Sequence, residues 1–286
     1  MSACAGQKRI TFDSRLIITK FKENGEENGM ARVFITGSSD GLGKMAAELL
    51  IEQGHKVVLH ARNEARARQT SSAVPGAETI VIGDLSSIGQ TKEVANQVNA
   101  LGAFDAIIHN AGVGYREAKR MTEDGLPHVL AINTLSPYIL TATIRMPKRL
   151  VYLSSGMHHG AGTDLSDLTW SRRSWNGSAA YAETKFQDVL LAFAVARLFP
   201  DVYSNALEPG WVPTKMGGAG APDDLDQAHL TQVWLATSND PEACVSGQYF
   251  YHQRLRKSNP AARDLTKQAQ LLEACETISG IALDRT

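Results

Sequence analysis

Short apolar segments rich in β-branched residues alternate along the chain with longer segments of helical periodicity. Alternation of this kind predicts an α/β fold, in which strands and helices follow one another along the chain. We expect a doubly wound, mostly parallel seven-stranded sheet with helices on both faces, forming a single domain over residues 30–286. The expected strands are residues 31–35, 56–60, 79–82, 106–109, 149–153, 202–207 and 248–251.

Three helical segments can be assigned to residue ranges. Residues 126–139 read as a helix despite Pro127 and Pro137, and residues 179–198 read as a longer one. We expect both to lie on the outside of one face of the sheet. Residues 260–280 predict an amphipathic C-terminal helix that packs on its own domain. Its apolar side comprises Leu265, Ala269, Leu272 and Cys275.

The composition excludes several classes of protein. With 286 residues, of which 43% are hydrophobic and 21% charged, the chain can bury a sizeable core. A net charge of −1 gives no electrostatic reason to bind nucleic acid or an anionic membrane, and no apolar run is long enough for a transmembrane helix. Three scattered cysteines fit neither a disulfide framework nor a zinc site. We therefore expect a cytoplasmic protein without a metal, nucleic-acid or membrane partner.

The N-terminal segment differs in character from the rest of the chain. Residues 22–29 are polar and acidic, as in a linker, and Met30 directly precedes the first expected strand. The apolar run at residues 16–19 is too short for the core of a signal peptide. We expect residues 1–29 to be a tail outside the domain. A short extra strand at residues 15–20 is the alternative.

A glycine-rich turn, TGSSDGLG, comes after the first expected strand. Glycines allow the backbone to approach a phosphate closely, and the next helix presents free N–H groups and a positive dipole. The order strand, turn, helix therefore predicts a dinucleotide site, although the spacing differs from the commonest fingerprint and a turn without a ligand is the competing interpretation. The residues of this candidate site are Gly37, Ser38, Ser39, Gly41, Leu42 and Gly43.

Polar or turn-forming residues also follow the other expected strands. In a doubly wound sheet, ligands bind outside the carboxyl ends of the strands. Each residue type could serve in an ordinary turn, but a series of them at one edge of the sheet indicates a binding site. Besides the glycine turn, the series consists of Arg62, Asp84, Leu85, Asn110, Ala111, Gly112, Ser155 and residues 209–214.

Tyr181 and Lys185 are four residues apart in the predicted helix 179–198, so their side chains share a face. A phenol with a pKa of about 10 is a poor acid–base catalyst at neutral pH, and a nearby ammonium favours the phenolate. Lowering that pKa to near 7 needs roughly 4 kcal/mol, more than one solvated charge supplies. An oxidised nicotinamide ring would add a second positive charge. The pair alone is commonplace, and only the glycine turn and Ser155 favour a catalytic interpretation.

The order of these motifs resembles that of the short-chain dehydrogenases/reductases over essentially all of residues 31–251. TGSSDGLG matches the family's TGxxxGxG, HNAG its NNAG, YAETK its YxxxK, and a PGxxxT segment comes after them in order. Within the family, the chain looks most like the retinol-dehydrogenase-like and WW-domain-oxidoreductase-like branch. No WW domain and no membrane anchor are visible. The resemblance implies a Rossmann fold.

The resemblance implies a catalytic role for four residues. Tyr181 would be the general acid in carbonyl reduction or the base in alcohol oxidation, and Lys185 would bind the ribose hydroxyls and lower the pKa of the tyrosine. Ser155 would hydrogen-bond the substrate oxygen. Asn133 would hold a water that links Lys185 to solvent as a proton relay.

The resemblance also implies the cofactor contacts. Asp84 would contact the adenine, whereas Val212 and Thr214 would hold the carboxamide. The remaining contacts that it implies come from Leu85, Asn110, Ala111, Gly112, Pro209 and Gly210.

Two segments bear on the substrate. The chain between Ser155 and Tyr181 is longer than is usual in the family, and we expect residues 157–178 to cover part of the substrate pocket as a lid. His158 and His159 in this segment are more typical of surface or supporting positions than of proton transfer. Residues 213–225, rich in glycine and proline, predict a second, mobile part of the lid.

The choice of cofactor depends on the end of the second expected strand. An acidic residue there would accept a hydrogen bond from the ribose 2′-hydroxyl of NAD. This chain has Ala61 followed by Arg62, which can pair with a phosphate. Asp40 in the glycine turn weighs mildly the other way. We predict a preference for NADP(H) over NAD(H).

The predicted function is that of an NADP-dependent oxidoreductase, which transfers hydride between NADP(H) and a carbonyl or alcohol substrate. Trp175, Trp211 and Met216 favour a lipophilic substrate. The alternative is a non-catalytic NADP-binding redox sensor or scaffold, although such relatives usually lack the tyrosine or the lysine. An epimerase or dehydratase would favour a different glycine spacing. The resemblance also implies a homo-oligomer, a dimer or tetramer, paired through helices 126–139 and 179–198.

Overall fold

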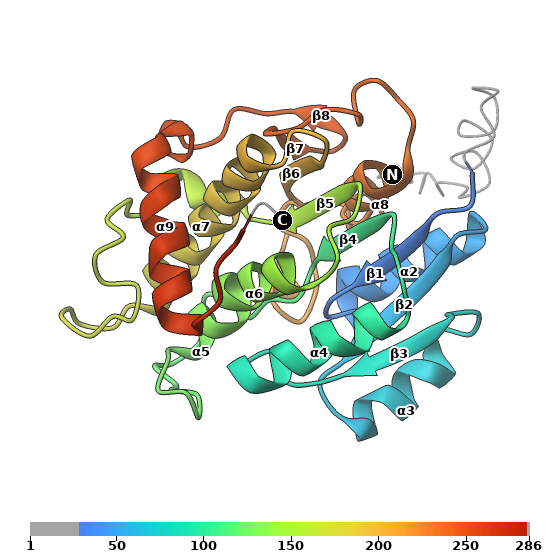
Figure 1. Ribbon diagram of the computed structural model, residues 1–286, viewed down its shortest axis with the longest axis horizontal. Coiled ribbons are helices and arrows are strands. Elements are labelled where there is room, and N and C mark those ends of the chain that lie inside the picture. The colour runs from blue at the N-terminus through green and yellow to red at the C-terminus, as the bar shows by residue number, and fades with distance from the viewer. Residues whose placement is uncertain (1–28, 285–286) are drawn as a thin grey trace, which may run out of the picture.

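A computed structural model of the chain describes residues 29–284. Apart from Gly29, the predicted tail and the alternative strand at 15–20 lie outside these residues. The described strands form one sheet in the order β3-β2-β1-β4-β5-β6-β7-β8, parallel from β3 to β7 (Figure 1). They are β1 (Arg32–Ile35), β2 (Lys56–Ala61), β3 (Thr79–Ile82), β4 (Ala106–His109), β5 (Arg149–Leu153), β6 (Tyr203–Glu208), β7 (Tyr249–Tyr251) and β8 (Arg254–Leu255).

The sheet has one strand more than the seven predicted. All seven predicted strands are present, with small differences at their ends. The additional strand, β8, pairs antiparallel with β7 and contains only Arg254 and Leu255, both exposed. Two exposed residues leave no run of buried apolar positions, so the hydrophobic pattern could not reveal this strand.

Helices cover both faces of the sheet, which confirms the doubly wound α/β architecture (Figure 1). Successive strand residues point to opposite faces, so that Phe34 lies in one core and Val33 and Ile35 lie in the other. The helices of the first core are α4 (Ile88–Ala100), α6 (Ser136–Thr143), α7 (Gly177–Leu198) and α9 (Leu265–Ser279). Those of the second core are α2 (Gly41–Glu52) and α8 (Leu230–Thr237). A further helix, α3 (Glu64–Ala73), packs on β2 and β3.

The strand order reverses at β1, which pairs with β2 on one side and with β4 on the other. Connections leave β1 and β4 in opposite directions, so the chain opens a crevice above their carboxyl ends. The fold therefore places the glycine turn and the segment after β4 side by side.

The helix predicted at 126–139 begins and ends later. Its parts are α5 (His128–Leu130), a π-helical turn (Ala131–Leu135) and α6 (Ser136–Thr143). Pro127 precedes the first turn, where its missing N–H is not needed, and Pro137 lies in the first turn of α6, just after the π turn. A π turn inserts one extra residue into the helical ladder and is frequent at functional sites. Here that turn carries Asn133.

The expected outer position of the two central helices is wrong. Most residues of α7 are buried, because α9 packs over it on the side away from the sheet. The chain after α9 also covers α6, since the Tyr138 hydroxyl donates a hydrogen bond to the carbonyl oxygen of Ile281 at 2.7 Å. The chain thus covers with its own C-terminus the surface that the resemblance assigned to a second subunit.

The predicted apolar side of α9 is also partly wrong. Leu265 is 60% exposed and Ala269 is exposed, whereas Leu271 and Cys275 enter the core. Gln268 lies on the same buried side and donates to the carbonyl oxygen of Ala262. Docking against α7, with this polar contact, decided which side is buried, and the apolar pattern alone did not. Over residues 29–284, no helix combines the length and the apolar character that crossing a membrane requires.

Candidate active site

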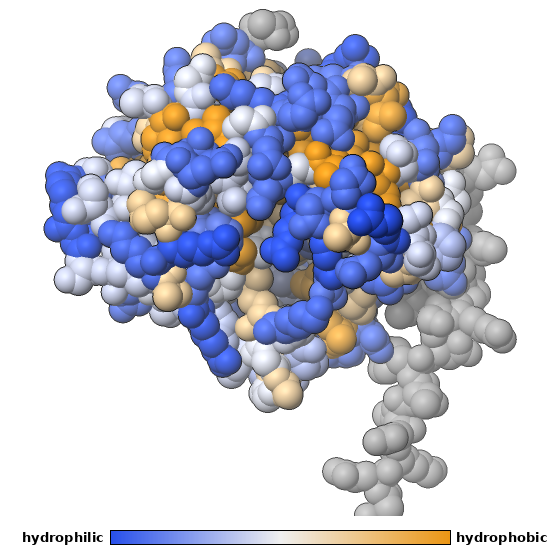
Figure 2. All heavy atoms as spheres, turned by 90° about the horizontal axis from the view of Figure 1, so that it is seen from below, coloured by the Kyte–Doolittle hydropathy of each residue, from blue (hydrophilic) through white to orange (hydrophobic). Residues whose placement is uncertain are grey.

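A cavity of about 1410 Å³ lies at the carboxyl ends of the parallel strands. Figure 2 shows a face of the molecule that is hollowed near its centre, where hydrophobic and polar residues border the hollow. Most of the residues predicted from the sequence line this one cavity. They are Gly37, Ser39, Gly41, Leu42, Arg62, Asp84, Leu85, Asn110, Ala111, Gly112, Ser155, Tyr181, Lys185, Pro209, Gly210, Val212 and Thr214.

Three predicted residues, Ser38, Gly43 and Asn133, do not line the cavity and are buried. Gly43 is close-packed, because a Cβ there would lie 2.3 Å from Nδ2 of Asn110 and 2.5 Å from the carbonyl oxygen of Gly37. The Ser38 hydroxyl donates to the carbonyl oxygen of Ile35 at 3.0 Å. Ser38 and Gly43 thus shape the glycine turn from behind.

His60 fixes the turn from the neighbouring strand. Its Nδ1 accepts the backbone N–H of Gly37 at 3.1 Å, and its Nε2 donates to the carbonyl oxygen of Gly83 at 2.8 Å. These two bonds require the neutral ring, and burial lowers the pKa of His60. Gly37 itself has φ +64°, and a Cβ there would lie 2.8 Å from the Cα of Ala111. The first and fourth strands can therefore approach only because residue 37 is glycine.

Asn110 joins the glycine turn to the end of β4. Its side-chain amide donates to the carbonyl oxygens of Thr36 and Gly37 at 3.0 and 3.1 Å. The hydroxyl of Thr36 in return accepts the backbone N–H groups of Asn110 and Ala111, each at 3.0 Å. The resulting wall is rigid, with Gly112 facing the cavity.

The end of the cavity next to β2 carries two arginines. Arg62 follows β2 directly, and Arg66 lies one helical turn further along α3. Asp40, which caps the N-terminus of α2, lies 3.7 Å from Arg66 and also pairs with Lys215. The hydrogen bond from Lys215 is the main reason that the pKa of Asp40 is lowered. The exposed Arg62 and the partly buried Arg66 thus face this end of the site, together with an anion that Arg66 shares with Lys215.

Tyr181 lies one turn into α7 and is only 6% exposed. Its ring meets that of Tyr115 edge-on, with centroids 6.0 Å apart. Ser155 caps the short helix Gly156–Gly160, where its hydroxyl oxygen accepts the N–H of Met157 at 3.3 Å. The hydroxyl proton of Ser155 is therefore free to donate into the cavity that it shares with Tyr181.

Lys185 is held by groups beneath the cavity. Its Nζ donates to the carbonyl oxygen of Leu153 at 2.7 Å and to Oδ2 of Asp188 at 2.8 Å, and it lies 5.9 Å from the centre of the Tyr181 ring. Burial acts to lower the pKa of Lys185, but the charges of Asp188 and Tyr181 and the hydrogen bond to Asp188 together raise that pKa. The lysine therefore remains an ammonium.

Asn133 lies behind the cavity wall. Its Oδ1 accepts the N–H of Val113 at 2.8 Å, and its Nδ2 donates to the carbonyl oxygen of Val113 and to the Thr184 hydroxyl, both at 3.1 Å. Asn133 and Lys185 meet at Gly112, where a Cβ would lie 3.5 Å from Oδ1 and 3.6 Å from Nζ. The π turn of the helix brings this amide to the lysine.

The segment after β6 closes the cavity opposite the glycine turn. The N–H of Trp211 donates to Oδ2 of Asp223 at 2.6 Å, and the N–H of Asp223 donates to the carbonyl oxygen of Trp211 at 3.0 Å. The chain between Trp211 and Asp223 makes a closed loop that carries Val212 and Thr214. The side chain of Trp211 remains 54% exposed. Lys215 joins this loop to Asp40 across the cavity.

Known proteins are similar to this chain in sequence and in fold. Residues 31–224 match the family model described as short chain dehydrogenase, which is more than half of the chain. This protein belongs to the short-chain dehydrogenase family. It is therefore an oxidoreductase by family, built on a single Rossmann-like domain.

Relatives and solved structures agree with this assignment. An uncharacterised oxidoreductase of Emericella nidulans, AN7799, is 44% identical over 259 residues, covering 89% of this chain and 99% of that protein. Human retinol dehydrogenase 13 is 30% identical and covers 81% of this chain and 79% of its own, which confirms the resemblance to the retinol-dehydrogenase-like branch.

Two crystal structures share the fold. An uncharacterised protein from Mycobacterium paratuberculosis has a TM-score of 0.77 at 21% identity, covering 89% of this chain and 95% of its own. A metagenomic blue fluorescent protein in complex with NADPH has a TM-score of 0.62 at 20% identity, covering 78% of this chain and 96% of its own.

The inserted segment of this short-chain dehydrogenase contributes little to the cavity wall directly. Of residues 157–178, only Met157 and Ser178 line the cavity. His158 is fully buried, where its Nδ1 lies 2.7 Å from the carbonyl oxygen of Ser155 and its Nε2 accepts the N–H of Asn259 at 3.1 Å. Burial lowers the pKa of His158 to about 4. These contacts give His158 the supporting position expected of it.

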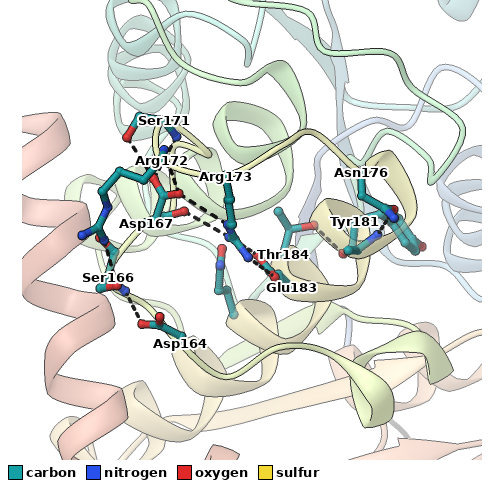
Figure 3. A network of polar contacts seen from close by, with 12 residues as sticks. Asp164, Ser166, Asp167, Ser171, Arg172, Arg173, Asn176, Tyr181, Glu183 and Thr184 are labelled. Carbon is teal, nitrogen blue, oxygen red and sulfur yellow. Dashed lines mark hydrogen bonds and ion pairs between the residues drawn. The ribbon is translucent and has the colours of Figure 1, made fainter.

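Arg173 ties the inserted segment to α7, the helix that carries Tyr181, as Figure 3 shows. It donates to both carboxylate oxygens of Glu183 on α7, at 2.7 and 2.6 Å, and its Nε lies 3.4 Å from Asp167. Its guanidinium also stacks on Trp170, 3.7 Å from the ring centre. The segment is thus fixed beside Tyr181 by an ion-pair network rather than lying free above it.

Several cavity residues were not predicted from the sequence. Some lie on segments that only the fold brings to the site. The one sequence feature that could have indicated such a residue is Glu208, a charged residue at the end of an apolar strand. Glu208 pairs with Arg256 at 2.5 Å. The unpredicted lining residues include His60, Arg66, Tyr115, Arg116, Glu208, Tyr251 and Arg256. Among the residues that the structure describes, none form a group of three or more possible metal ligands.

Proposed function

We propose that this short-chain dehydrogenase reduces a carbonyl, or oxidises the corresponding alcohol, with NADP(H) as cofactor and Tyr181 as the acid or base. The observation that carries the proposal is that Ser155, Tyr181 and Lys185 line the same cavity as the glycine turn. A substrate oxygen within reach of the serine and tyrosine hydroxyls would lie beside the cofactor.

The residues present fit a nicotinamide dinucleotide. Gly41 lines the cavity and has open space at its Cβ position, so the backbone of the turn can approach a phosphate there. The N-terminus of α2 begins at this residue. Asp84, Asn110 and Thr214 line this cavity, where Asp84 and Asn110 would contact the adenosine and Thr214 would hold the carboxamide. Such a cavity of about 1410 Å³ accommodates a dinucleotide and a small substrate together.

The chain supplies positioning and proton transfer. When bound, the nicotinamide supplies hydride chemistry. Ser155 donates a hydrogen bond to the carbonyl oxygen, and Tyr181 donates the proton that this oxygen needs as it becomes a hydroxyl. The ammonium of Lys185 stabilises the tyrosinate that remains. Asn133, close to Lys185 at Gly112, holds the water through which a proton returns from solvent to Lys185.

Two features support NADP(H) over NAD(H). Arg62 and Arg66 both face the β2 end of the cavity, where a 2′-phosphate would lie, and Ala61 takes the place of an acid. The related fold that contains NADPH supports a nicotinamide cofactor in general. We further propose a cytoplasmic location. If copies of the chain assemble, we propose that they use a surface other than α7, which α9 covers.

The decisive experiment is Tyr181→Phe, tested with NADPH against a panel of aldehydes and ketones. Loss of the proton donor should lower kcat/KM by roughly 10²- to 10⁴-fold, because general acid catalysis contributes about that much. NADPH affinity, measured by fluorescence, should stay within about threefold, since the phenyl ring keeps its place. Tyr115→Phe removes a hydroxyl from the neighbouring ring of the same cavity and serves as the matched control.

The competing function is that of a redox sensor that binds NADP without turnover. That function would be supported if the wild-type protein bound NADPH but oxidised it with no member of the panel. Equal turnover by wild type and Tyr181→Phe would instead overturn the role of the tyrosine.

A further inference from the structure

Asp188 lies directly behind the catalytic lysine. It is three residues further along α7, so the two side chains share a helical face. Oδ2 of Asp188 accepts from Nζ of Lys185 at 2.8 Å, and the two side chains are only 3% and 6% exposed. Asp188 does not line the cavity, whereas Lys185 does. The carboxylate therefore reaches the site only through the lysine.

The contacts of Lys185 leave it one free donor. An ammonium has three N–H groups, and Leu153 and Asp188 accept two of them, at 2.7 and 2.8 Å. The third is the one available toward Gly112, Tyr181 and the cavity. Asp188 and the backbone of β5 thus set the direction in which the lysine can act.

The other titratable groups around this pair are uncharged at neutral pH. Tyr152 on β5 stays a phenol because burial raises its pKa. Its hydroxyl pairs with Thr141 at 2.8 Å, and that hydroxyl in turn lies 3.2 Å from His109. Burial lowers the pKa of His109 to about 3, so the imidazole is neutral. On α7 itself, Asp188 and Tyr181 are the groups whose charge acts on Lys185.

We propose that Asp188 is a positioning residue that holds Lys185 in place and opposes the effect of the lysine's charge on Tyr181. This inference rests on the proposed role of Tyr181. A lone ammonium close to the phenol would favour the tyrosinate strongly. A carboxylate on the far side of the ammonium opposes that effect, and the protonated phenol is the form that can donate to a carbonyl.

The test is the ionisation of Tyr181 in the protein without added ligand. The ultraviolet absorbance of tyrosinate is followed during a pH titration, and the difference from Tyr181→Phe isolates this one phenol. In Asp188→Asn, the amide oxygen can still accept from Lys185, but the negative charge is gone. We expect the midpoint of the Tyr181 titration to fall by about one pH unit in this variant, as the removal of a nearby unit charge predicts.

A matched control separates charge from packing. Gln187→Leu alters the adjacent buried residue of the same helix, whose side chain accepts from the Thr134 hydroxyl at 2.7 Å, without changing any charge at Lys185. In Gln187→Leu, the midpoint of the Tyr181 titration should equal that of the wild type. Asp188→Ser provides a second neutral variant in case the asparagine variant does not fold.

The outcome is clear in either direction. A midpoint that is unchanged in the neutral variants, or that moves to higher pH, overturns the proposal, because Asp188 would then not oppose the charge of Lys185. A kinetic readout is added where turnover is found: carbonyl reduction by Asp188→Asn should lose its activity about one pH unit earlier on the alkaline side. Absence of turnover would contradict the proposed function, yet it would leave the titration fully informative.

Discussion

At the scale of single residues, Arg62 gives the sharpest test of the cofactor. It is exposed, directly follows β2 and faces the cavity beside Arg66. Arg62→Asp places at this point the kind of side chain that accepts a hydrogen bond from a ribose 2′-hydroxyl and repels a 2′-phosphate. We expect NADPH affinity to fall by about tenfold or more and NADH use to improve, measured as the ratio of the two kcat/KM values.

The control for this substitution is Arg68→Asp, an exposed position on α3 that does not line the cavity. It makes the same change of charge away from the site, so it should leave the cofactor ratio nearly unchanged. A wild-type protein that already works better with NADH would show that the interpretation of Arg62 is wrong.

Residue-scale prediction from sequence succeeded where a motif fixes the position. The glycines of TGSSDGLG, Asn110, Ser155, Tyr181 and Lys185 are recognisable because few residue types can take their places. Glu208, Arg256 and Asp188 carry no such pattern. A charged side chain in an apolar strand or helix is a weak signal until its partner is known, and each partner here is found only in three dimensions.

At the scale of elements, the inserted segment is a fixed support of α7. Its Arg173 is 35% exposed and bridges two buried carboxylates, those of Glu183 and Asp167. Arg173→Ala would leave both carboxylates without a counter-charge. Breaking buried pairs is strongly destabilising, and the partial exposure of the arginine reduces the effect, so we expect a loss of about 2 kcal/mol in the free energy of unfolding.

Urea unfolding measures this loss, and Arg172→Ala is the matched control. Arg172 is exposed, and its side chain donates only to Ser166, so its removal should cost less than about 0.5 kcal/mol. Equal effects of the two substitutions would mean that the bridge to Glu183 does not fix the segment to α7.

Elements with strong hydrophobic patterns were predicted well, and those shaped by contacts were not. The strands buried on both faces could be placed closely, because each contains a short, continuous apolar run. The π turn that carries Asn133, the two-residue strand β8 and the buried side of α9 depend on neighbours that are distant in sequence. Local periodicity contains no information on those neighbours.

At the scale of the whole molecule, two buried histidines make the fold sensitive to acid. Burial lowers the pKa of His109 to about 3 and that of His158 to about 4. Below about pH 6.5 the unfolded chain binds protons at both positions, whereas the folded chain does not. Stability therefore falls as the pH drops from about 6.5 toward 4, and these residues have no effect on its pH dependence above that range.

His109→Asn should remove part of this sensitivity. Between about pH 7 and pH 4 the variant should lose roughly 3 kcal/mol less unfolding free energy than the wild type, because an asparagine takes up no proton. Unfolding by urea at the two pH values gives this difference.

The sequence alone determined the alternation of strands and helices, the glycine turn and the motif residues that line the cavity. It could do so because periodicity and motifs are local properties, which depend only on residues that are close together in the sequence. Only the tertiary structure decided that α9 covers α7, that Arg173 anchors the inserted segment, and that Asp188 lies behind Lys185. Each of these depends on packing between segments or on the direction of a buried side chain, and burial in a low-dielectric interior is what gives those contacts their strength.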